Sequence, residues 1–164
     1  MNIEEVIRLP DSMPAVEIYE LFERAINDFE QNKLDKPTFF DILYELTDRQ
    51  GYTYEVLANP LREELDDLIC GLWNTRDYDE VDIMLVFIVN LALVKSFACV
   101  KKSIEIKNNI DSKILEEIQD TIAEVGDNIS NPYYDLEKLK KVVDKDSDEM
   151  VKWAMNEDLR NWRK

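Results

Sequence analysis

Carboxylates are the side chains of this sequence whose type and spacing could do chemistry. The chain has 36 Asp and Glu against 20 Lys and Arg and no histidine, so its formal net charge is −16. Without histidine, neither a Ser-His-Asp triad nor a His-containing zinc or di-iron site is possible. Clustered carboxylates can still bind Mg²⁺, which orients phosphates and an attacking water. The composition therefore favours binding over catalysis and leaves one metal-dependent exception.

The acidic residues gather in two short clusters. Residues 1–94 hold 21 acidic and 7 basic residues, a net charge of −14, whereas residues 95–164 hold 15 and 13, a net charge of −2. The first cluster consists of Glu63, Glu64, Asp66 and Asp67, and the second of Asp77, Asp79, Glu80 and Asp82. Because only nine residues separate them, we expect the clusters on consecutive helices near a shared turn.

Tyrosines accompany this charge. Tyr78 lies within the second cluster, and Tyr52 and Tyr54 lie beside Asp48 and Glu55. Tyrosine is a frequent interface anchor, and complementary charge steers association with a basic partner. The predicted partner-binding residues are Asp66, Asp67, Asp77, Tyr78, Asp79, Glu80, Asp82, Tyr52 and Tyr54. The alternative is that the two clusters are solvated helix faces. Their acidic residues would then lie near helix N-termini because the helix dipole stabilises negative charge there.

The same carboxylates carry a second interpretation. Glu63-Glu64-Leu65-Asp66-Asp67 followed by Asp79-Glu80-Val81-Asp82 resembles the Glu-Glu-x-x-Glu and Glu-x-x-Asp pattern of all-helical, magnesium-dependent nucleotide pyrophosphatases related to MazG. The resemblance covers about twenty residues, and Asp67 and Asp79 stand where the family has Glu. It implies an Mg²⁺ site formed by Glu63, Glu64, Asp67, Asp79 and Asp82.

A weaker similarity concerns residues 131–135, Asn-Pro-Tyr-Tyr-Asp. Small helical immunity proteins that inhibit DNase colicins are similar in using a tyrosine pair beside acidic residues to contact the basic nuclease. The chain is about twice their size, and no other segment aligns with them. The similarity implies only how acid and tyrosine together can inhibit a basic enzyme.

Nearly every segment has apolar residues at intervals of three and four, which is the spacing of one helical face. The predicted helices begin near Pro14, Pro37, Pro60, Tyr78, Ser112, Pro132 and Ser147. With three Gly and five Pro, the chain lacks the turns of sandwiches and barrels. We predict an all-α fold of six to seven helices around a long apolar helix at about residues 78–105, in a single domain over 1–164. Stacked helix hairpins remain possible.

The apolar stretch 83–100 and the cysteines bear on location. The charge-free run from Ile83 ends at Val94, which is short for a membrane span and suits a buried helix. Cys70 and Cys99 lie in apolar helical stretches and are predicted to be reduced and buried. The acidic start lacks the basic n-region of a signal peptide. We therefore expect a soluble, cytoplasmic protein.

These observations predict a non-enzymatic acidic protein, an immunity- or antitoxin-type inhibitor that occludes a basic partner such as a cognate nuclease toxin. It is expected to be a monomer or homodimer without a cofactor and to bind no nucleic acid directly, because the pI is about 4.4. Two alternatives stay open: the Mg²⁺-dependent pyrophosphatase, and a helical scaffold or adaptor that dimerises through an apolar helix face.

Overall fold

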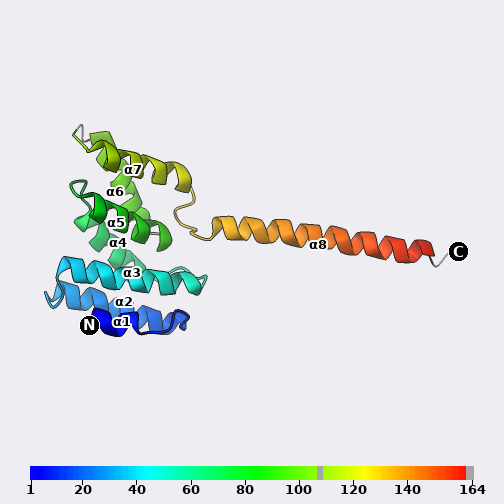
Figure 1. The fold of residues 1–164 in the computed structure, drawn as a ribbon, viewed down its shortest axis with the longest axis horizontal. Helices are drawn as coiled ribbons and strands as arrows, with labels where there is room; N and C mark the ends of the chain where they lie inside the picture. The colour runs from blue at the N-terminus through cyan, green and yellow to red at the C-terminus, as the bar shows by residue number, and fades with distance from the viewer. Residues whose placement is uncertain (107–108, 162–164) are drawn as a thin grey trace. The chain divides into compact units, whose positions relative to one another are not determined.

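The computed structural model describes residues 1–106 and 109–161, with side chains for 1–106, 109–142, 144, 145 and 147–150 (Figure 1). Within these ranges the fold is all-α, as predicted, with eight helices and no strand. The chain divides into two compact units, Met1–Pro132 and Tyr133–Lys164, and each is described by itself. A single domain over 1–164 stays a prediction.

Stacked helix hairpins build the first unit. Its helices are α1 (Ile3–Ile7), α2 (Ala15–Glu30), α3 (Lys36–Tyr52), α4 (Leu61–Leu72), α5 (Tyr78–Asn90), α6 (Val94–Ile106) and α7 (Ser112–Val125). Figure 1 shows the pairs α2–α3, α4–α5 and α6–α7 lying on one another in this order. Contacts of α4 with α2 and α6 make one layer, and contacts of α3 with α1 and α5 and of α5 with α7 make the other.

Aromatic rings hold neighbouring helices together. Phe29 of α2 stacks on Phe39 of α3 with ring centroids 4.2 Å apart. Phe40 of α3 meets Phe87 of α5 edge-to-face at 5.6 Å. Stacked and edge-to-face pairs are the arrangements that the ring quadrupole favours, and they add to the free energy of burial. These contacts fix α3 between α2 and α5 and leave one of its faces uncovered.

Two helices, α5 and α6, occupy the range in which the sequence predicts one long helix. The turn between them, Leu91, Ala92 and Leu93, is at most 2% exposed, and Ala92 has a φ of 56°. The three turn residues are apolar and include no Gly, Pro or charge, so Asn90, the last residue of α5, is the local sign of a helix end here. Folding back lets each helix bury its own apolar face, α5 chiefly against α3 and α7 and α6 chiefly against α4. No helix in the described ranges is long and apolar enough to cross a membrane, as predicted for residues 83–100.

The second unit consists of α8 (Tyr134–Asn161), a single helix where the sequence predicts two. A helix start at Ser147 is predicted from its capping side chain. However, residues 134–161 contain no Gly or Pro, so nothing in this stretch forces the preceding helix to end.

Candidate functional site

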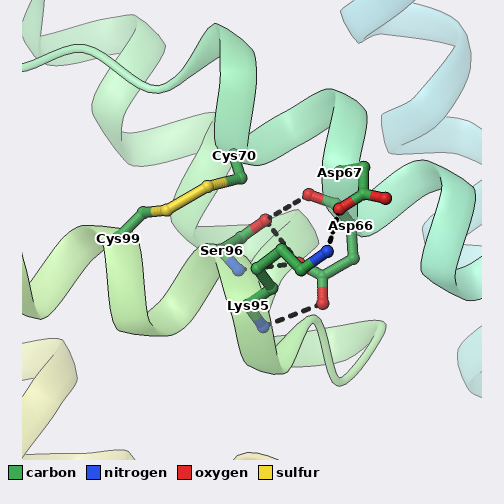
Figure 2. A network of polar contacts seen from close by, with 6 residues as sticks. All are labelled: Asp66, Asp67, Cys70, Lys95, Ser96 and Cys99. Carbon is green, nitrogen blue, oxygen red and sulfur yellow. Dashed lines mark hydrogen bonds and ion pairs between the residues drawn. A yellow bond between two sulfur atoms is a disulfide. The ribbon is translucent and has the colours of Figure 1, made fainter.

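Asp66 of the first acidic cluster is a buried structural residue. It is 9% exposed. Its carboxylate accepts hydrogen bonds from the backbone N–H of Lys95 at 2.8 Å, from that of Ser96 at 2.7 Å, and from Ser96 Oγ at 2.6 Å (Figure 2). Asp66 thus caps the start of α6 from a neighbouring helix, satisfying N–H groups that have no partner within α6. These bonds engage the Asp66 carboxylate within the chain, and its contact with a partner protein stays a prediction.

One turn further along, Cys70 of α4 and Cys99 of α6 form a disulfide. Figure 2 shows it beside the Asp66 network, and the two Cα atoms are 6.2 Å apart. The prediction of two reduced cysteines is therefore corrected. The sequence treats each cysteine as part of its own helix, whereas the packing of α4 on α6 brings them together. We call this arrangement, Asp66 and Cys70 facing Ser96 and Cys99, the α4–α6 seam.

Asp67 lies at the edge of the seam and pairs with the side chain of Lys95. The hydrogen bond and charge of Asp67 raise the pKa of Lys95. Both side chains are about three-fifths exposed, so the pair contributes little to stability. Arg62, Glu63 and both partners of this pair line a pocket of about 570 Å³ between α4 and α6. The acidic side chains of this pocket already have partners within the chain: Asp67 has Lys95, and Glu63 accepts a hydrogen bond from Asn59 at 3.1 Å.

The second acidic cluster mainly builds the start of α5. The Asp77 carboxylate accepts a hydrogen bond from the backbone N–H of Glu80 at 3.0 Å and caps the helix. The Glu80 carboxylate accepts from Lys36 Nζ at 2.7 Å and from Asn74 Nδ2 at 2.8 Å. The bond from Lys36, and then that from Asn74, lower the pKa of Glu80. Asp77 and Glu80, predicted to contact a partner, thus have partners within the chain.

Tyr78 is likewise held within the first unit. Its hydroxyl donates to Glu117 Oε2 at 3.3 Å, and Lys113 Nζ lies 3.9 Å from the ring centroid. Burial, and then the negative charge of Glu117, raise the pKa of Tyr78. A partly buried ring with two such contacts ties α5 to α7. The role of Tyr78 as an interface anchor stays a prediction.

The two acidic clusters do not form one carboxylate site. Glu63 lies in the first turn of α4 and Asp79 in the first turn of α5, and a five-residue connection makes these helices antiparallel. The nine residues from Glu63 to the end of α4 span about 14 Å. Among the residues that the structure describes, no group of three or more Asp, Glu or Cys could hold a metal ion. The magnesium set Glu63, Glu64, Asp67, Asp79 and Asp82 is therefore not assembled.

Exposed acid and tyrosine alternate on α3 instead. Asp41, Tyr44, Asp48 and Tyr52 follow at intervals of three, four and four, which places them on one helical face. Both aspartates are exposed, and Tyr44 and Tyr52 are 45% and 58% exposed. We call these four residues the α3 stripe. The predicted residue Tyr54, 66% exposed, follows just beyond the end of α3.

Two of the predicted aspartates share the side of the α3 stripe. Asp79 and Asp82 are exposed on α5, which is the neighbour of α3 in the same layer. Since α3 packs on α2 and α5 packs on α4 and α6, the exposed faces of α3 and α5 both point away from the other layer. Sequence reasoning missed Asp41 and Tyr44. Their spacing from Asp48 and Tyr52, opposite the apolar positions of the same helix, was the signal for them.

Comparisons with protein-family models, with curated proteins and with solved structures find no match for this chain.

The exposed acids and tyrosines described above define the candidate surface. It consists of the α3 stripe together with Tyr54, Asp79 and Asp82.

Proposed function

We propose that this protein is a non-enzymatic acidic binding protein, an immunity- or antitoxin-type inhibitor that covers the functional surface of a basic partner such as a nuclease toxin. The observation that carries the proposal is the α3 stripe, in which two exposed tyrosines alternate with two exposed aspartates. Tyrosines anchor interfaces by burying large rings, and aspartates steer cationic surfaces towards them. The pyrophosphatase alternative lacks an assembled carboxylate set, and no observation favours the scaffold alternative.

The distribution of charge supports a cationic partner. Residues 1–132 hold 28 acidic and 12 basic residues, a net charge of −16, whereas residues 133–164 hold eight of each. The whole net charge therefore belongs to the unit that carries the α3 stripe. A nuclease needs Lys and Arg to hold phosphates. Carboxylates that engage those cations compete directly with the nucleic acid, so occlusion requires no chemistry from this protein.

The cysteine pair bears on where this binding takes place. Disulfides persist in oxidising compartments and are rare in the cytosol. The pairing of Cys70 with Cys99 therefore favours an oxidising environment over the cytoplasmic location predicted from the sequence. Inhibition requires only that both proteins share a compartment. Counting free thiols in protein alkylated at the moment of cell lysis separates the two locations, since a cytoplasmic protein would show two.

A first experiment identifies the partner by capture from the native cells on immobilised protein, with elution by rising salt. We expect one strongly basic protein that elutes over a defined salt range, because steering by opposite charge weakens with ionic strength. Purified partner then allows association rates to be measured. A partner that is acidic, or whose release is insensitive to salt, contradicts the proposal.

The kinetic experiment compares two double variants of equal charge change. Asp41→Asn with Asp48→Asn neutralises the α3 stripe, and Glu20→Gln with Glu23→Gln neutralises two exposed acids of α2 in the other layer. We expect the first pair to slow association about tenfold at low salt and the second less than twofold. Equal effects of both pairs would mean that only net charge matters, and the α3 stripe would then not be the binding surface.

A further inference from the structure

Apolar side chains are exposed along one face of α8. Leu136, Leu139 and Met150 are 45%, 60% and 72% exposed. Their spacing fits positions a and d of a heptad repeat, which lie on one side of a helix, and we call these three residues the α8 face. In the sequence, Val143 and Trp153 occupy two further positions of the same repeat. The pattern is that of a helix that packs on another helix.

The second unit offers this face nothing to pack against. α8 is the only helix that the structure describes in this unit. Helices in proteins derive most of their stability from the packing of an apolar face, and exposed apolar patches mark sites of association. With 28 residues, α8 is about 42 Å long, which is enough for a contact of several heptads.

The distribution of charge indicates which molecule covers the α8 face. Residues 1–132 carry a net charge of −16, so two copies of this chain repel one another through their first units. Residues 133–164 hold eight acidic and eight basic residues, so a second copy can approach here without that repulsion. A cationic protein gains no net attraction from this neutral segment. The charge therefore favours a second α8 as the occupant.

The order of the charges along α8 favours an antiparallel pair. Residues 134–145 hold four basic and three acidic residues, a net charge of +1, whereas residues 146–161 hold two and five, a net charge of −3. In an antiparallel pair the first half of each helix lies beside the second half of the other, so opposite net charges meet. In a parallel pair, like net charges meet. The antiparallel pair also keeps the two N-terminal ends of α8 about 40 Å apart.

We propose that this protein forms a homodimer in which two α8 helices pair antiparallel through the α8 face. The pairing joins two copies of the same binding protein, so it adds to the proposed function and does not depend on it. In the sequence, Asp146 interrupts the heptad spacing. A charged residue at such a position lowers the stability of a helix pair, so we expect a reversible dimer with a Kd on the order of 10 µM.

Sedimentation equilibrium of the full chain, from about 1 µM to about 500 µM, measures the dimer. We expect Leu136→Gln with Leu139→Gln to raise the Kd at least tenfold, because both side chains lose apolar contact. The matched control is Ile7→Gln with Val16→Gln, which changes two exposed apolar residues of the first unit and should leave the Kd unchanged. A chain that stays monomeric over this range, or equal effects of the two double variants, would overturn the inference. Neither result would touch the proposal for the α3 stripe.

A distance measurement tests the orientation of the pair. Tyr134→Cys places a nitroxide spin label at the first residue of α8, and the native cysteines are already paired with each other. Residue 134 precedes Leu136 by two positions, so it lies on the opposite side of the helix and outside the α8 face. We expect a label-to-label distance of about 40 Å, which Leu136→Gln with Leu139→Gln should abolish. A distance below about 20 Å would show a parallel pair and overturn the antiparallel arrangement.

Discussion

The α4–α6 seam and the α3 stripe are both acidic, but their acids have different surroundings. In the seam, Asp66 is buried against three hydrogen-bond donors beside a disulfide. In the stripe, Asp41 and Asp48 are exposed on either side of Tyr44. Carboxylates that accept several hydrogen bonds hold helices together, whereas exposed carboxylates beside exposed rings remain available to another molecule. Local acidity in a sequence therefore indicates function only after the partners of each acid are known.

The largest effect is expected from opening the disulfide in the seam. Replacing Cys70 and Cys99 together by Ser releases a crosslink between residues 29 apart in sequence, which lowers the free energy of unfolding by about 3.5 kcal/mol in the chain-entropy model. Thermal unfolding should then begin roughly 10 °C lower. Association with the basic partner below that temperature should not change. A variant that unfolds normally but associates slowly would make the seam part of the interface.

A somewhat smaller loss of stability is expected from Asp66→Ala. The change removes the cap of α6 and leaves the buried Ser96 hydroxyl without an acceptor side chain, so we expect a loss of about 2–3 kcal/mol. Asp67→Ala is the matched control one residue away. It breaks only an exposed ion pair and should cost less than about 1 kcal/mol. Denaturant unfolding measures both, and equal losses would show that the burial of Asp66 does not matter.

In the α3 stripe the expected effect concerns binding and leaves stability unchanged. Tyr44→Ala and Tyr52→Ala should each weaken the complex by about 1–2 kcal/mol, seen mainly as faster dissociation. Their unfolding free energies should stay within about 0.5 kcal/mol, because exposed side chains are replaced. Tyr134→Ala, an equally exposed tyrosine of α8, is the control. A larger effect there would assign the contact to residues 131–135 instead.

The smallest effect is expected from the contacts that the Glu80 carboxylate makes with Lys36 and Asn74 at the start of α5. Lys36, and then Asn74, hold the pKa of Glu80 below its ordinary value of 4.5. A lowered pKa in the folded state means that this stabilisation is complete above pH 4.5 and disappears as the pH falls through the folded value. Glu80→Gln lacks this pH-dependent stabilisation. Its free energy of unfolding should therefore fall less than that of the original protein below pH 4.5, by a difference of less than about 1 kcal/mol. Asp82→Asn, on the exposed face of the same helix, is the control variant with the same change in charge.

Helix positions were largely predictable because their signals are local. Asp35, Asp77 and Asp111 accept hydrogen bonds from backbone N–H groups in the first turns of α3, α5 and α7, as their sequence context indicates. Gly126 ends α7 with a φ of 53°, which glycine adopts easily. The turn at Ala92 was not predicted, because its residues are apolar throughout and Asn90 alone signals a helix end, whereas the packing of hairpins determines where the chain reverses.

The sequence by itself determined the helical class, most helix ends and the strong negative charge, since these follow from apolar spacing, capping residues and composition. Only the tertiary structure decided which acids are available. It placed Asp66 under the start of α6 and Cys70 beside Cys99, and it left Tyr44 and Tyr52 uncovered. The physical reason is that exposure and hydrogen-bond partners depend on contacts between residues about thirty positions apart. Local spacing carries no information about such contacts.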